Sequence, residues 1–125
     1  MSRGAVLDAL GRAAVGLPFI VLGAGAAREP GGRVGLAAKM GGPQPELAVR
    51  ANGAAMVLGG LAVITGRAER SAGAGLAVSL VPTTLAAHRY WEMDDPAARG
   101  QNRIHWWKNV GLLGATLLLI ARPRR

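Results

Sequence analysis

The polar residues best suited to chemistry gather in and after one connecting segment near the end of the chain. The candidates for a site are His88, Asn102, His105, Lys108 and Asn109. On a helix, the last four recur three, six and seven residues apart and share one side. Their imidazole, amide and ammonium groups can donate to a carbonyl or a phosphate, which indicates a quinone or lipid head-group site. The alternative is a structural polar clasp, and the sequence leaves both interpretations open.

Several other kinds of chemistry have no support in the sequence. The chain has no cysteine, which excludes disulfides, thiolate metal sites and thiol catalysis. His88 and His105 lack an acid or a second pair that would complete a metal or haem coordination shell. No phosphate-binding loop and no Ser–His–acid triad are recognisable. We therefore predict no metal and no catalytic residue, and the sequence favours a protein that is not itself an enzyme.

The composition indicates that lipid surrounds the chain. Half of its 125 residues are hydrophobic, only 4% are aromatic and 19 are glycine, so the apolar part consists mainly of Ala, Val and Leu. Small residues at this density suit closely packed helices in a membrane. The formal charge of +8 invites a nucleic-acid interpretation. However, the cationic residues lie between long uncharged runs rather than along one face, so we predict membrane lipid and not nucleic acid as the partner.

Four charge-free runs are the main structural signal: residues 13–27, 51–66, 71–88 and 109–121. Crossing a hydrocarbon layer of roughly 30 Å takes about 20 helical residues, so each run must include its flanks. We predict spans over residues 7–27, 47–65, 71–87 and 103–120. The fold class is therefore all-α: a single integral-membrane four-helix bundle made by residues 1–125.

The connections between the spans differ in length. Residues 66–70 form a short link, so the second and third spans should be antiparallel neighbours. Two clusters of Pro and Gly bracket residues 33–40 in the first loop, and this bracketed segment is predicted to be a short interfacial helix. Tyr90, Trp91, Trp106 and Trp107 gather around the third loop and form half of an aromatic belt.

Four spans place both termini on one face of the membrane. The positive charges divide evenly between the two faces, but arginines at positions 122, 124 and 125 are concentrated in a short tail at the membrane. By the positive-inside rule, we predict that both termini are cytoplasmic in a bacterial inner membrane.

Two arginines and two rows of small residues suggest how the helices are held. Arg12 and Arg50 lie near opposite ends of the predicted bundle, so they should not share a site, and Asp8 is an i, i+4 partner for Arg12. Small residues recur every fourth position at 51, 55 and 59, and again at 111 and 115. Such rows let helix backbones approach closely. We expect them to pack within the bundle, with contact to another subunit as the alternative.

The order of these features resembles the DoxX family of small bacterial membrane proteins over nearly the whole chain. The matching landmarks are Arg12, Gly16 and Phe19 in the first span, Lys39-Met40 before the Gly42-Pro43-x-Pro45 turn, residues 58–62 and Gly66 in the second span, His88, and residues 106–114 in the fourth. The resemblance implies a four-helix membrane fold and an association with respiratory or sulfur-linked redox complexes. It also implies an acid shortly before the Gly-Gly of the second span, where this chain has Met56, so a reaction that used that acid is lost here.

Three functions remain open on the sequence. The first is a non-catalytic accessory subunit that docks against other subunits of a larger membrane complex. The second is a quinone-handling oxidoreductase component, with quinone as the cofactor. The third is a protein that binds a lipid or small hydrophobic ligand, with homo-oligomeric packing as a variant.

Overall fold

A computed structural model of the chain describes residues 1–123. In this part the regular elements are all helices, namely five α-helices and one 3₁₀ helix, joined by turns and loops. Their bounds are α1 (Arg3–Arg28), α2 (Arg33–Lys39), α3 (Pro45–Thr65), α4 (Glu69–Ala87), η1 (Tyr90–Glu92) and α5 (Pro96–Ala121). The predicted all-α class is confirmed. Beside the four long helices there is a fifth α-helix, α2, in the bracketed segment of the first loop where a short helix was predicted. The arginines of the tail at positions 124 and 125 lie outside the described residues.

Three of these helices, α1, α3 and α5, are long and apolar enough to cross a membrane. The predicted third span corresponds to α4, which has 19 residues but contains Ser, Thr and Gly among its apolar residues. By length and composition, α4 is therefore not among the three helices that are long and apolar enough to cross a membrane. The structure thus confirms a helical fold with membrane-spanning capacity, in three helices rather than four.

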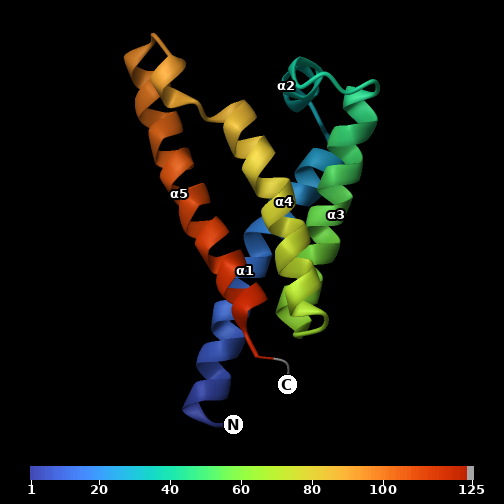
Figure 1. Cartoon of the computed structure of the whole chain (residues 1–125), viewed down its shortest axis with the longest axis vertical. Helices are drawn as coiled ribbons and strands as arrows, with labels where there is room; N and C mark the ends of the chain where they lie inside the picture. The colour runs from blue at the N-terminus through green and yellow to red at the C-terminus, as the bar shows by residue number, and fades with distance from the viewer. Residues whose placement is uncertain (124–125) are drawn as a thin grey trace.

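The long helices alternate in direction (Figure 1). From the end where the two termini lie, α1 runs to the opposite end, α3 returns, α4 runs back out and α5 returns again. The two helices α3 and α4 are antiparallel neighbours joined by the short link at residues 66–68, as predicted. The small helix α2 and the loop that carries η1 both lie at the end away from the termini.

Local caps explain why two helices begin earlier than predicted. The Ser2 side chain accepts a hydrogen bond from the backbone N–H of Ala5, so α1 begins at Arg3. The Asp95 side chain accepts from Ala98 N–H at 2.8 Å, and Pro96 occupies the first turn of α5. Each cap thus begins a first turn that contains charged residues. Such turns lie outside the apolar runs, so the hydropathy pattern does not predict them.

Glycines let α1 and α3 pack with their backbones nearly touching. A Cβ added at Gly23 would lie 2.6 Å from the carbonyl oxygen of Gly53, and one added at Gly60 would lie 2.7 Å from that of Gly16. These two pairs, each seven residues apart along its helix, are therefore the crossing points of α1 and α3. The predicted small-residue rows do not have this role. The residues at 51, 55 and 111 are exposed, Ala115 is half-buried, and Gly59 lies against the Leu76 side chain of α4.

All four long helices contribute to one apolar core. It consists of Phe19 from α1, Val63 from α3, Leu76 and Leu80 from α4, and Leu119 from the C-terminal half of α5. The N-terminal half of α5 lies beyond this core and diverges from α1 and α3 in Figure 1. The polar side chains of this outer half of α5 therefore meet α4 and the third loop rather than the centre of the bundle.

Candidate functional site

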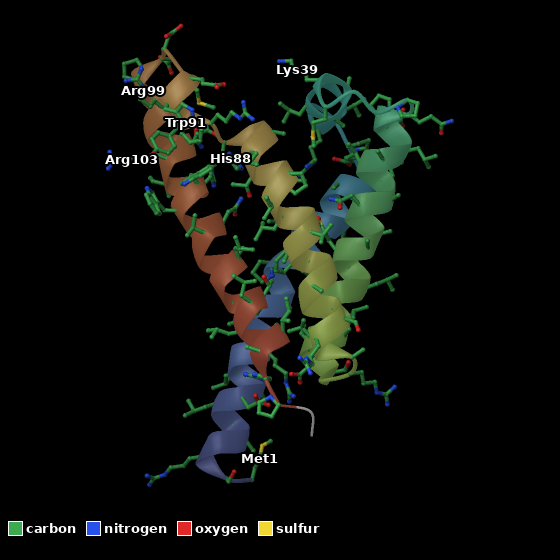
Figure 2. All side chains as sticks on the ribbon, viewed as in Figure 1. Met1, Lys39, His88, Trp91, Arg99 and Arg103 are labelled. Carbon is green, nitrogen blue, oxygen red and sulfur yellow. The ribbon has the colours of Figure 1, made fainter. Side chains whose placement is uncertain are left out.

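The polar candidates lie where the end of α4 faces the outer half of α5. His88 immediately follows α4, and the other four predicted residues are on α5. Because the two helices are antiparallel, the last turn of α4 lies beside the first turns of α5. Figure 2 shows His88 between the two helices, close to Trp91 of η1. The antiparallel packing thus brings residues together that are 14 to 25 positions apart in the chain.

Two hydrogen bonds join α4 to α5 across this contact. His88 Nδ1 and Asn102 Oδ1 are 2.7 Å apart, and the Asn102 amide also donates to the Ala98 carbonyl at 2.9 Å. One to two turns deeper, Asn109 Nδ2 donates to Thr84 Oγ1 at 3.0 Å. Thr84 is buried, with 8% of its surface exposed. Since unpaired polar groups are costly away from water, these bonds fix the distance and register between the helices.

The remaining two candidates are more exposed. The His105 ring stacks on His88 with centroids 5.1 Å apart, so it joins the same contact by one face. Lys108 is exposed and, within residues 1–123, has no hydrogen bond or ion pair to another side chain. The structure therefore brings His88, Asn102, His105 and Asn109 into one contact along α4 and leaves Lys108 at its edge. Whether any of them holds a quinone or a lipid head group stays a prediction.

Aromatic rings cover the outer end of this contact. The ring centroids of Trp91 and Trp106 are 4.9 Å apart and nearly perpendicular, and Tyr90 packs edge-on against Trp91 at 5.3 Å. The Trp106 ring is also edge-on to Tyr90 at 6.3 Å, so Trp106 holds η1 against α5. The predicted gathering of aromatic residues at the end away from the termini is thus present, although Trp107 points elsewhere and is 57% exposed.

Thr84 is the member of this contact that the sequence analysis missed. It lies four residues before His88, so both side chains project from the same side of α4 near its end. Its hydroxyl is the acceptor for the Asn109 amide. The i, i+4 spacing from His88 was the available signal for Thr84. A threonine within an apolar run does not by itself indicate a polar site.

A second polar cluster lies at the opposite end of the bundle and was only partly predicted. Arg12 Nη1 lies 3.1 Å from both Asp8 Oδ2 and Glu69 Oε1, which confirms the predicted Asp8 partner. Arg122 Nη1 contacts the same two carboxylates at 2.8 and 3.4 Å. Each arginine therefore bridges both acids, and the four groups tie α1, α4 and the residue after α5 together. Sequence spacing could predict only the pair within α1.

The link between α3 and α4 depends on a glycine beside this cluster. Gly66 ends α3 with a φ of 71°, in the left-handed region. A Cβ at this position would lie 2.6 Å from Arg12 Nη1. The turn after α3 thus needs glycine both for its backbone conformation and to admit the Arg12 guanidinium to Glu69.

Arg50 has a separate, structural role. Its guanidinium donates to the carbonyls of Ala27 and Arg28 at 2.7 and 3.2 Å and to the Glu46 carboxylate. Carbonyls at the end of a helix lack partners within that helix, so Arg50 caps α1. As predicted, Arg12 and Arg50 do not share a site.

Comparison with known proteins decides the family. The sequence model of DoxX matches residues 7–89, which is more than half of the chain. The chain belongs to the DoxX family. This DoxX-family chain is also 33% identical over 114 residues to inner membrane protein YphA of Escherichia coli (strain K12), covering 91% of this chain and 81% of that protein. No solved structure gives a significant match.

The DoxX match ends at residue 89, so it includes α1 to α4 and His88 but not α5. It also includes Met56, where the resemblance implies an acid. Met56 packs against the apolar core, and its Sδ lies 3.6 Å from the Asn52 amide nitrogen. The Asn52 amide oxygen in turn accepts a hydrogen bond from Ser79 of α4 at 2.8 Å. In this DoxX protein, the position thus contributes to the packing of α3.

Proposed function

We propose that this DoxX-family protein crosses the bacterial inner membrane four times and acts as a non-catalytic accessory subunit of a larger, redox-linked membrane complex. The topology rests on α4. If α3 ends on the face of the termini and α5 begins on the opposite face, the segment between them must cross, and α4 with 19 residues is about 28 Å long. Four crossings then make the fold a four-helix membrane bundle, with α2 lying at the interface as the predicted short segment.

The accessory role is supported mainly by how the polar side chains between the helices are used. His88, Asn102, Asn109 and Thr84 pair with one another between α4 and α5. Both acids of the cluster at the other end pair with arginines of the same chain. Polar groups that satisfy one another stabilise a scaffold and leave fewer donors and acceptors for a substrate. A rigid bundle with an apolar exterior suits a subunit that contributes structure to a complex.

Co-purification tests the accessory role. The full chain is extracted from its native membrane in mild detergent and analysed by native mass spectrometry. We expect a complex of fixed stoichiometry with unlike membrane subunits, at least one of which carries a redox cofactor. Recovery only as a monomer or only as a homo-oligomer, under conditions that keep other respiratory complexes intact, overturns the proposal. Stoichiometric release of a quinone by solvent extraction of the lone chain supports the quinone alternative instead.

Orientation is tested by cysteine labelling, because the chain contains no cysteine of its own. We propose cytoplasmic termini, supported by the arginine-rich tail. Ser2→Cys should react with a membrane-impermeant maleimide in inverted vesicles and not in right-side-out vesicles. Asp94→Cys in the third loop is the matched control and should show the reverse pattern. The same accessibility for both variants contradicts the four-span topology.

A further inference from the structure

The outer half of α5 has a second face, turned away from α4, that neither the polar contact nor the core uses. Arg103, Ile104, Trp107 and Lys108 are all exposed there, Ile104 and Trp107 by 57% each. Successive helical residues are rotated by about 100°, so Arg103 and Lys108 lie about 140° apart with Ile104 and Trp107 between them. Figure 2 shows Arg103 extending from α5 on the side opposite to His88. Two cations thus flank an apolar strip.

The strip continues toward the other end of α5 over two glycines. A Cβ added at Gly111 or Gly114 would meet no atom within 4 Å, in contrast to the glycines at the crossing of α1 and α3. Gly111 falls on the centre line of the strip, about one turn beyond Trp107. The absence of side chains there leaves a shallow notch in the helix surface that no other part of residues 1–123 fills.

The two cations are not neutralised by the acids of the third loop. Glu92 pairs with Arg89 at 3.6 Å, and Asp95 caps the first turn of α5. Neither Arg103 nor Lys108 has a hydrogen bond or ion pair to another side chain among the described residues. Side chains on a helix lean toward its N-terminus, which for α5 is the end at the third loop. Both charges therefore reach toward the third-loop end of α5, in whose N-terminal half they lie.

We propose that this face of α5 binds an anionic phospholipid. The phosphate lies between Arg103 and Lys108, the ester region beside the Trp107 indole, and an acyl chain over Gly111. A phospholipid presents a phosphate, an ester and a hydrocarbon chain in this order along the membrane normal. On α5, Arg103 is nearest the third loop, Trp107 and Lys108 follow, and the open apolar surface at Gly111 lies deepest. The long Lys108 side chain leans back toward the third loop, so its ammonium can join Arg103 at the phosphate. A second copy of the chain fits this face poorly, because it would place the same two cations against each other. The inference requires α5 to lie in the bilayer and does not depend on the accessory role.

Native mass spectrometry of the full chain, released from nanodiscs of defined composition, tests the lipid site. In mixed phosphatidylglycerol and phosphatidylcholine, we expect the protein to retain one phosphatidylglycerol. Removing both charges with Arg103→Gln and Lys108→Met should lower the retained fraction, with affinity falling about tenfold for each cation. The matched control is Lys39→Met with Arg67→Gln, which removes the same net charge from exposed positions outside α5 and should leave retention unchanged.

Two further measurements separate a lipid from other sources of the same signal. Gly111→Leu fills the notch and keeps both cations, so it should also reduce retention of phosphatidylglycerol. Inorganic phosphate should not displace the lipid, because it lacks the acyl chain.

Three results overturn the proposal: equal losses in the two double variants, equal retention of phosphatidylcholine, or displacement by phosphate. The first means diffuse attraction by surface charge, and the last means a free-anion site. Loss of the lipid with the larger complex intact supports the lipid site and leaves the proposed function standing, since the two are measured separately.

Discussion

Replacing Gly23 by alanine tests the packing of α1 on α3. The new Cβ would lie 2.6 Å from the Gly53 carbonyl oxygen, 2.8 Å from Met56 Cβ and 3.1 Å from Val57 N, whereas ordinary contact begins at 3.4 Å. Two of these three atoms belong to the α3 backbone and cannot rotate away. The helices must separate, and overpacking of this kind costs about 1–3 kcal/mol.

The matched control is Gly25→Ala, two residues further along the same helix. A Cβ there meets no atom within 4 Å. Alanine raises helix propensity over glycine by up to about 1 kcal/mol, and this gain applies equally to both variants. We therefore expect Gly23→Ala to be destabilised by about 1–2 kcal/mol and Gly25→Ala to be unchanged or slightly stabilised.

Reversible unfolding by added SDS, followed by the far-ultraviolet circular dichroism and the fluorescence of the three tryptophans, measures this difference in the full chain. The double variant Gly23→Ala with Gly53→Ala adds a second readout. Once the helices have separated at this crossing, the second methyl group costs less than it does alone, so the two effects should not add. Equal unfolding midpoints for Gly23→Ala and Gly25→Ala would refute the assignment of this crossing.

Three further predictions concern the polar clusters. Arg12→Gln leaves two mostly buried carboxylates with one bridging cation, so it should lower the free energy of unfolding by about 3 kcal/mol. Arg122→Gln, at a side chain 38% exposed, should lower it by at most about 1 kcal/mol. Equal unfolding midpoints in SDS for the two variants would contradict this order. Asn109→Leu leaves the buried Thr84 hydroxyl without its donor and should cost about 1–3 kcal/mol, while Asn109→Ser should restore part of the loss if the hydrogen bond is responsible. If the quinone alternative holds, Lys108→Met should weaken binding of a soluble quinone, measured by equilibrium titration, without changing the unfolding midpoint. An unchanged affinity would remove Lys108 from any quinone site.

The positions of the helices were largely predictable, and their ends were not. Runs without charged residues mark α1, α3, α4 and α5 because a charged side chain in hydrocarbon is costly. Pro and Gly clusters marked α2. The start of α5 at Pro96 was missed, because the cap at Asp95 begins a polar first turn that hydropathy assigns to the loop.

The sequence predicted most residues of the candidate site but not which residues they contact. The spacing of Asn102, His105 and Asn109 placed them on one side of a helix, and the structure confirms that this side meets α4. Thr84 was missed because the residue opposite Asn109 depends on the register between two helices. Lys108 shared the sequence pattern but lies at the edge of the contact, since its position around the helix differs by about 120° from that of Asn102.

By itself, the sequence determined that lipid is the surrounding solvent, that the chain is helical, and roughly where the helices lie. These properties follow from hydropathy and charge along the chain, which are local. Only the tertiary structure decided which glycines meet, which arginines bridge Asp8 and Glu69, and which face of α5 stays open. The physical reason is that helices in lipid are apolar on nearly all sides, so composition does not mark the inward face. The close fit of small residues and the pairing of polar groups select that face, and both depend on neighbours distant in the chain.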